Sequence, residues 1–457
     1  MEKEQFHFEV VPLSRALRTA ITLFVAAFVI QTTADDWPRF RGAGGDGVSV
    51  DRSIPLHWGD GRNLAWRAAL PGPGSSSPIV SRGRVFVTSY SGYGVDRDNS
   101  GRMKDLRRHL VCFDAATGRE IWKQTIAAAL PEDAYRGYIA EHGYASNTPV
   151  TDGERVYAFF GKSGAIAFDC ETGRELWRAN LGMESGNRRW GSAASPILFQ
   201  DKLIVTASEE SQSVCALDKV TGRELWKAEG SNLELVYSTP RVIDAGGRQD
   251  LVVAAVNEVW GLNPENGKLR WLAETGVPGN VCPGVVYADE TIYTFGGFPR
   301  RVAAAIRVGG KGDVTDTHVR WTSGDSPYVP TPVFREGAFY WVDRSGIAQC
   351  IRASDGGSVY RERLQSGGER IQVYASPVIV GDRIIAVTRN AGVFVLAPGP
   401  EFRQLARNVF ESDNSEFCGT PAVAGGRLFL RSNEALYCVK ATTGASISPV
   451  TAPEGFN

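Results

Sequence analysis

Short apolar runs separated by turn residues recur along most of the chain. From Pro78 to Trp122 the pattern is an apolar run, a turn at Arg82-Gly83, and three further apolar runs, of which the second ends at Phe113. Runs this short, bounded by turn residues, favour strands over helices. Four short antiparallel strands in about 45 residues are typical of one β-propeller blade.

A turn motif marks the end of the third strand. The segment D-x-x-T-G-R-E-[I/L]-W occurs three times and has a weaker fourth copy, at 114–122, 169–177, 218–226 and 263–271. The Asp or Asn side chain can cap the turn, Gly can take its left-handed position, and β-formers follow. The motif therefore predicts a tight turn between the third and fourth strands.

A second marker, a small residue before proline, counts the repeats. It occurs at Ser77-Pro78, Thr148-Pro149, Ser195-Pro196, Thr239-Pro240, Cys282-Pro283, Thr331-Pro332, Ser376-Pro377 and Thr420-Pro421. One four-stranded sheet cannot bury both of its faces, whereas a ring buries each face against a neighbour. The sequence predicts an all-β fold, an eight-bladed propeller with four-stranded antiparallel blades.

The two ends of the repeat region complement each other. The last repeat, 436–444, lacks its Trp strand, and an orphan strand of that type, Asn63 to Arg67, precedes the first repeat. We expect the strand of Trp66 to complete the eighth blade, which removes the open sheet edges. The predicted organisation is a signal peptide at 1–34, a leader at 35–62, the propeller at 63–447 and a tail at 448–457.

The amino-terminal segment has the pattern of an export signal. Arg15 and Arg18 precede the apolar run 20–30, which as a helix would be about 16 Å long and too short to span a ~30 Å hydrocarbon layer. Small residues end at Ala34, where a signal peptidase could cut. We expect a periplasmic or secreted monomer with no integral membrane span after cleavage; an uncleaved anchor is the alternative.

The A-x-D-x-x-T-G-x-x-x-W pattern at 167–177 and 216–226 resembles the tryptophan-docking motif of pyrroloquinoline quinone (PQQ)-type propeller repeats. These repeats occur in quinoprotein alcohol dehydrogenases and in non-enzymatic relatives such as the outer-membrane β-barrel assembly lipoprotein. The resemblance covers roughly residues 35–445. It implies that the Trp of the motif docks against the adjacent blade, which gives this role to Trp66, Trp122, Trp177, Trp226, Trp271 and Trp321. It also implies that the segment 37–42 packs over the ring.

The charge balance excludes nucleic acid as an expected partner, and the positions of the cysteines indicate a packing role. The 50 Lys+Arg and 51 Asp+Glu leave a net charge of −1, so no broad field attracts nucleic acid. The seven Cys include no C-x-x-C pair. Cys112, Cys350 and Cys438 stand where other repeats have small residues, and we interpret them as small apolar side chains.

Two motifs imitate known sites. The segment 42–47 reads G-x-G-x-x-G, but no strand and helix flank it as a dinucleotide site requires. The segment 96–101 resembles half a calcium loop, yet Arg107 occupies the twelfth position, where a carboxylate is needed. We interpret both as ordinary loops. Arg102, Lys104, Arg107 and Arg108 suggest a local basic patch in the first-blade insertion.

Quinoprotein dehydrogenases need PQQ, calcium and a catalytic Asp. No carboxylate of this chain can be matched to that Asp, so the catalytic residues are unknown and neither a metal site nor a cofactor is assigned. The alternative function is a dehydrogenase of alcohols or sugars that uses PQQ and calcium. We predict a binding or scaffolding module for a protein or small-molecule ligand at the funnel mouth. Its candidate residues lie ahead of the proline markers: Arg188, Arg189, Trp190, Tyr237, Asn280, Tyr328, Tyr374 and Glu416.

Overall fold

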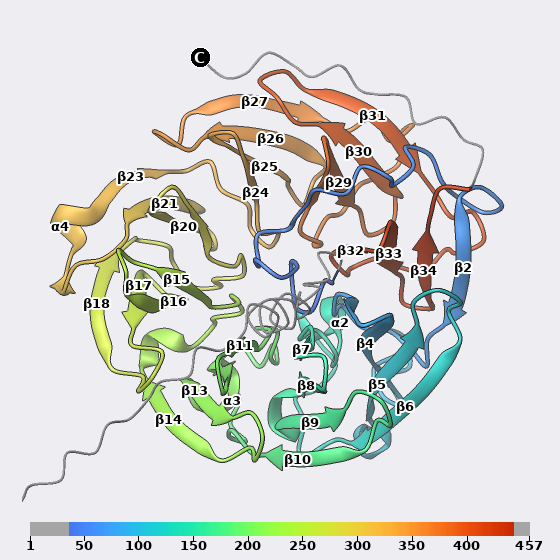
Figure 1. The fold of residues 1–457 in the computed structure, drawn as a ribbon, viewed down its shortest axis with the longest axis horizontal. Coiled ribbons are helices and arrows are strands. Elements are labelled where there is room, and N and C mark those ends of the chain that lie inside the picture. The colour runs from blue at the N-terminus through green and yellow to red at the C-terminus, as the bar shows by residue number, and fades with distance from the viewer. Residues whose placement is uncertain (1–35, 443–457) are drawn as a thin grey trace, which may run out of the picture. The chain divides into compact units, whose positions relative to one another are not determined.

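The computed structural model describes residues 36–442, and eight sheets are arranged in a ring (Figure 1). The first four blades are β3 (Ile79–Ser81), β4 (Arg84–Ser91), β5 (Arg107–Asp114) and β6 (Glu120–Ala127); β7 (Val150–Thr151), β8 (Arg155–Phe159), β9 (Ala165–Asp169) and β10 (Glu175–Ala179); β11 (Ile197–Phe199), β12 (Lys202–Ala207), β13 (Ser213–Asp218) and β14 (Glu224–Glu229); β15 (Arg241–Asp244), β16 (Gln249–Ala255), β17 (Glu258–Leu262) and β18 (Leu269–Glu274). The other four are β19 (Val286–Ala288), β20 (Thr291–Gly296), β21 (Val302–Arg307) and β23 (Val319–Ser323); β24 (Val333–Arg335), β25 (Ala338–Val342), β26 (Ile347–Arg352) and β27 (Ser358–Arg363); β28 (Val378–Val380), β29 (Arg383–Val387), β30 (Val393–Ala397) and β31 (Arg403–Asn408); β32 (Ala422–Ala424), β33 (Arg427–Arg431), β34 (Ala435–Val439) and β2 (Leu64–Ala69). The predicted eight-bladed propeller is confirmed.

The ring closes as the sequence predicts. Strand β2 pairs antiparallel with β34, and Trp66 lies opposite Cys438. Blade 8 therefore combines one strand from before the first repeat with three strands from the last. The predicted signal peptide, 1–34, and the predicted tail, 448–457, lie outside the described residues, so their boundaries stay predictions.

Two blades carry a fifth strand that the sequence did not predict. Strand β1 (Val48–Ser49) of the leader pairs parallel with β28 in blade 7, and β22 (Gly312–Asp313) pairs parallel with β18 in blade 4. Strand β22 belongs to the long connection between β21 and β23, which also carries α4 (Thr315–His318). Both additions cover sheet edges that a four-stranded blade would leave open.

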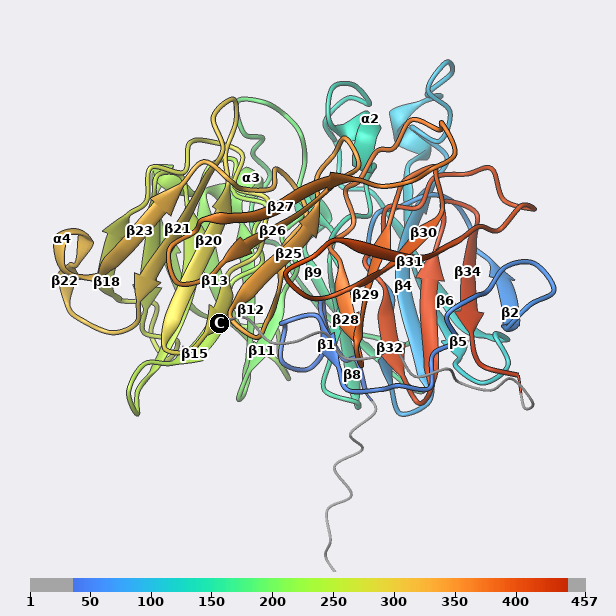
Figure 2. The same cartoon turned by 90° about the horizontal axis from the view of Figure 1, so that it is seen from above.

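The two faces of the ring differ. The helical turns η1 (Met103–Asp105), α2 (Ile139–His142), η2 (Gly161–Ser163), α3 (Ser208–Ser211) and η3 (Ser231–Leu233) lie in the loops. Figure 2 shows α2 and α3 at one face, which we call the upper face, and β1 toward the opposite, lower face. No helix in residues 36–442 is long and apolar enough to cross a membrane.

Five tryptophans make one repeated contact between blades. Each indole N–H donates to a backbone carbonyl in the third-to-fourth-strand turn of the next blade: Trp66 to Ala115 (3.2 Å), Trp122 to Cys170 (3.0 Å), Trp177 to Lys219 (3.1 Å), Trp226 to Pro264 (3.0 Å) and Trp321 to Ala353 (3.0 Å). The glycine of each turn lies against the indole ring of the docked Trp. At Gly173, for example, a Cβ would come within 2.6 Å of Trp122. The T-G part of the motif is thus a receptor for the preceding blade's Trp.

Trp271 departs from the expected docking. Its indole N–H donates to Asp250 Oδ2 of its own blade (2.8 Å), and Arg248 and Arg270 pair with the same buried carboxylate. The reason lies in blade 5, where the connection with β22 and α4 replaces the short D-x-x-T-G turn. Trp271 instead lies opposite Gly312 of β22 and is completely buried.

The cores lie between neighbouring blades, as a propeller requires. The interface between blades 1 and 2, for example, packs Phe86 and Leu110 against Val156 and Phe168. All seven cysteines are free thiols, and Cys112, Cys350 and Cys438 are buried in these interfaces. They act there as small apolar side chains.

Candidate functional site

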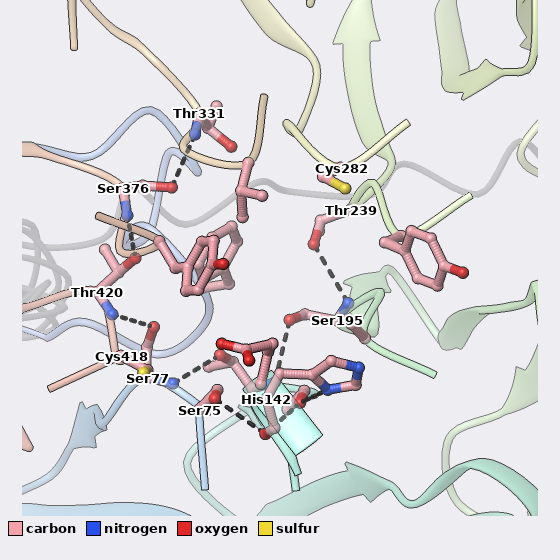
Figure 3. Close-up of a pocket in the computed structure, with 18 of the residues that line it drawn as sticks. Ser75, Ser77, His142, Ser195, Thr239, Cys282, Thr331, Ser376, Cys418 and Thr420 are labelled. Atoms are coloured by element: carbon pink, nitrogen blue, oxygen red, sulfur yellow. Dashed lines mark hydrogen bonds between the residues drawn. The ribbon is translucent and has the colours of Figure 1, made fainter. Parts of the chain in front are cut away.

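A ring of hydroxyl side chains surrounds the axis, and it is built from the residues before the marker prolines (Figure 3). In six of the eight blades the backbone N–H of this residue donates to the hydroxyl of the next: Ser77 to Thr148 (2.9 Å), Thr148 to Ser195 (3.0 Å), Ser195 to Thr239 (3.2 Å), Thr331 to Ser376 (2.9 Å), Ser376 to Thr420 (3.0 Å) and Thr420 to Ser77 (3.0 Å). These bonds give acceptors to backbone N–H groups that are largely shielded from water.

Blade 5 interrupts the ring, because Cys282 replaces the hydroxyl residue. Thr331 there accepts instead from the N–H of Gly284 (2.8 Å). The Cys282 thiol lies at the cavity wall, and burial raises its pKa to about 12. It is therefore a neutral thiol at physiological pH.

The leader forms the floor of the axial cavity. Phe40 lines the cavity, and the buried Arg41 guanidinium donates to three carbonyls of blades 6 and 7, those of Thr331 (3.0 Å), Pro332 (2.8 Å) and Pro377 (3.1 Å). This fixes the leader across the lower end of the axis.

The first-blade insertion forms the roof. His142 of α2 donates from Nε2 to the Trp190 carbonyl (2.8 Å), and burial lowers its pKa. Glu141 pairs with Arg389 across the ring and with Arg97 (3.2 Å). Burial works against its ionisation, but the Arg389 guanidinium holds the pKa of Glu141 below its usual value. The insertion thus folds over the upper face of the ring (Figure 2).

Buried ion pairs hold the insertion against blades 1 and 2. Arg108 pairs with Glu132, and Lys162 pairs with Asp133 (3.5 Å), all with nearly buried side chains. The expected basic patch is therefore wrong in one member, since Arg108 points inward to a partner. Arg102 pairs with Asp105 (2.8 Å).

Four of the eight predicted funnel residues line the cavity: Trp190, Tyr237, Tyr328 and Tyr374. The cavity measures about 170 Å³ for the centres of water-sized molecules, far more than the ~10–15 Å³ that one water needs. The residues of the hydroxyl ring also line this cavity.

The other four lie outside the cavity lining. Asn280 is buried behind Tyr328 and donates to its hydroxyl (3.3 Å). Glu416 accepts from Arg389 (2.7 Å). Arg188 and Arg189 are exposed at the upper face, and Arg188 lies over the Trp190 ring at 5.3 Å.

Sequence reasoning missed Tyr138, Glu141 and His142, because an irregular insertion gives no periodic signal. It also missed two buried acids on α3. Burial raises the pKa of Glu209 to about 7 and that of Glu210 to about 8. Glu209 accepts from the Tyr237 hydroxyl (3.1 Å), whereas Glu210 Oε2 has no hydrogen-bond partner within residues 36–442.

A family model described as outer membrane protein assembly factor BamB matches residues 106–361, more than half of the chain. The chain belongs to this family. A BamB from Kangiella koreensis is 27% identical over 194 residues, which are 42% of this chain and 41% of that protein. A polyvinylalcohol dehydrogenase from a Pseudomonas species is 25% identical over 249 residues, which are 50% of this chain and 32% of that protein. The chain thus matches less than half the length of either relative.

Solved structures agree on the fold. BamB from Moraxella catarrhalis superposes with a TM-score of 0.60 at 14% identity, covering 84% of this chain and 98% of that one. A europium-containing methanol dehydrogenase gives 0.58 at 11% identity, covering 88% and 90%. This BamB and this methanol dehydrogenase therefore share the propeller fold of the chain.

The cavity is a poor fit for calcium-bound PQQ. Its lining contains one carboxylate, Glu141, which already pairs with two arginines, and no Lys or Arg. Calcium takes six to eight oxygen ligands, usually with several carboxylates, and the carboxylates of the quinone would need cationic partners. Residues 36–442 also contain no cluster of three or more His, Cys, Asp or Glu suited to a metal ion.

Proposed function

We propose that this member of the BamB family is an exported binding and scaffolding propeller that holds a protein partner on its upper face, at the mouth of the axial funnel. The observation that carries the proposal is a cluster of five aromatic residues at that mouth, which we call the axial aromatic cluster: Tyr138, Trp190, Tyr237, Phe298 and Tyr328.

The members of this cluster come from five different loops, yet they contact one another. The ring centroids of Tyr138 and Trp190 are 4.3 Å apart, those of Trp190 and Tyr237 6.5 Å, those of Tyr138 and Tyr328 6.4 Å, and those of Phe298 and Tyr328 5.7 Å. Phe298 is 47% exposed. Trp, Tyr and Arg dominate the energetic centres of protein interfaces, and Arg188 stacks on Trp190 at the edge of this cluster.

The surface is also held in place before any partner arrives. The ion pairs of Arg108, Lys162 and Arg389 fix the insertion that supplies Tyr138. The propeller supplies the remaining rings from short loops on rigid strands. Preorganisation of this kind lowers the conformational entropy lost on binding, which suits a scaffold.

Site-specific photocrosslinking in cells tests the proposal. A photoreactive residue at Phe298 or Arg189 should yield a defined adduct with one envelope protein, and the same probe at the exposed Arg223, in a turn away from the cluster, should not. With the probe at Arg189, Trp190→Ala combined with Phe298→Ala should abolish the adduct while the melting temperature changes by less than a few degrees. Equal adducts from all three positions would contradict the proposal.

A dehydrogenase is the second candidate, because the chain resembles polyvinylalcohol dehydrogenase over half its length. Purified protein incubated with PQQ and calcium provides the test. Quinone absorbance that survives desalting, together with alcohol-dependent dye reduction, would replace the scaffold by an enzyme. Loss of the quinone on desalting is the expected result, given the donor set of the cavity.

A further inference from the structure

Three arginines meet at the lower end of the axis, on the other side of Phe40 from the axial cavity. Arg39 and Arg41 come from the leader, and Arg241 comes from β15 in blade 4. All three line one small cavity together with Thr239 and Thr331 of the hydroxyl ring. The cavity holds about 20 Å³ for the centres of water-sized molecules, slightly more than the ~10–15 Å³ that one water needs.

These guanidiniums lack counter-charges. None of them forms an ion pair within 4.0 Å in the described part of the chain, and Asp46 is the one carboxylate that acts on all three at longer range. Three guanidiniums and one carboxylate leave a local charge of about +2. Burial, followed by repulsion from Arg241, lowers the pKa of Arg39 to about 10. Burial lowers the pKa of Arg41 to about 9.

The donors of this cluster are only partly used. Arg41 is 2% exposed, and although its terminal nitrogens bind carbonyls, its Nε has no partner in residues 36–442. The buried Nη1 of Arg241 likewise has none. Arg39 uses Nε on the carbonyls of Gly42 (3.3 Å) and Ala43 (3.2 Å), and its terminal nitrogens make no hydrogen bond within the described range. Buried unpaired donors are costly, so an occupant that accepts from them would be stabilised.

The glycine-rich segment 42–47 shapes the site. A Cβ at Gly45 would lie 2.7 Å from Arg39 Nη2, and one at Gly47 would lie 2.9 Å from Arg41 Cζ. Both glycines also have positive φ, 71° and 76°. The strand β1, and not a helix, follows the segment. The glycines let the two guanidiniums lie directly against the loop.

We propose that Arg39, Arg41 and Arg241 form an anion site that binds a phosphate group, either as free inorganic phosphate or as the end of a phosphomonoester. The planar guanidinium fork matches phosphate oxygens, and a dianion balances the local charge of about +2. The bound group would tie the leader to blade 4 and so reinforce the floor of the funnel. The proposal is independent of the partner on the upper face.

Calorimetric titration and thermal melting of the full chain with inorganic phosphate, against chloride of equal ionic strength, test this site. The wild type should bind one phosphate and melt at a higher temperature, and Arg241→Gln and Arg39→Gln should each weaken binding at least tenfold. Arg223→Gln, an exposed control, should stay within twofold. Arg41 is not substituted, because it also holds the leader to blades 6 and 7.

The phosphate-free melting temperature separates a binding role from a structural one. Arg241→Gln should leave it unchanged or raise it, because the substitution removes a cation without a partner. A wild-type response to phosphate no greater than that to chloride, or an equal response in Arg241→Gln, would overturn the proposal. Glycerol 2-phosphate distinguishes the sources: binding shows that the site accepts the phosphate group of a larger molecule, and exclusion alongside phosphate binding shows that it encloses the free ion.

Discussion

Trp66→Ala probes the closing contact of the ring. Trp66 is 9% exposed, its N–H donates to the Ala115 carbonyl, and its ring covers Gly118, where a Cβ would lie 2.5 Å from the ring. Removing a buried Trp side chain costs about 3–5 kcal/mol. An unfolding entropy of about 2.1 cal/mol/K per residue over ~400 residues makes each kcal/mol worth roughly 1.2 °C, so the melting temperature should fall by roughly 4–6 °C.

Differential scanning calorimetry of Trp66→Ala beside Trp122→Ala gives the comparison. Trp122 makes the same contact inside the chain, between blades 1 and 2, with its N–H on the Cys170 carbonyl and its ring on Gly173. The two variants should lose similar stability, since each opens one joint of a closed ring. A melting temperature unaltered in Trp66→Ala but lowered in Trp122→Ala would show that β2 does not close the ring in solution.

Two further predictions concern the hydroxyl ring and the buried acids. Thr148→Val should lower the free energy of unfolding by about 1–3 kcal/mol, because the Ser77 N–H loses its acceptor. Cys282→Ser should raise it by about 0.5–1.5 kcal/mol, because the new hydroxyl gives the Thr239 N–H an acceptor. Urea titrations measure both, and variants as stable as the wild type would contradict this role of the hydroxyl ring. Glu210 has its pKa raised to about 8 from an unfolded value near 4.5, so the folded state binds the extra proton and stability is lost as pH rises from 4.5 through 8. Glu210→Gln should flatten this loss in melting curves recorded between pH 5 and 9, and an unchanged slope would show that another group is responsible.

Sequence reasoning reached the fold because each blade repeats the same local chemistry. The turn motif and the proline marker are visible without any knowledge of distant contacts, and so is the missing strand that Trp66 supplies. Trp271 could not be predicted, because its environment depends on β22, an insertion from the next blade. Local patterns therefore predict the unit well and its exceptions poorly.

Only four of the eight predicted funnel residues line the cavity, because local repeat patterns do not encode contacts made by the insertions and the leader. Tyr237 and Tyr374 stand three residues before their marker prolines and Tyr328 stands four before its own, so their convergence follows from the ring. Glu416 also stands near such a position, but Arg389 draws it into an ion pair. The meeting of Arg39 with Arg241 depends on where the leader crosses the axis, which no repeat encodes.

Because β2 pairs with β34, the first main blade strand in the chain belongs to the last blade of the ring. Blades 1 to 7 each take their four main strands from one continuous segment, whereas blade 8 joins residues about 370 positions apart, Trp66 and Cys438. During synthesis, β2 emerges before every other main strand of the eight blades, and its partner β34 is the last of them to emerge. Closing so long a loop carries an entropic cost and slows folding. A circularly permuted chain that begins at β3 and ends with β2 would build every blade from neighbouring residues, and the ring itself has no preferred beginning.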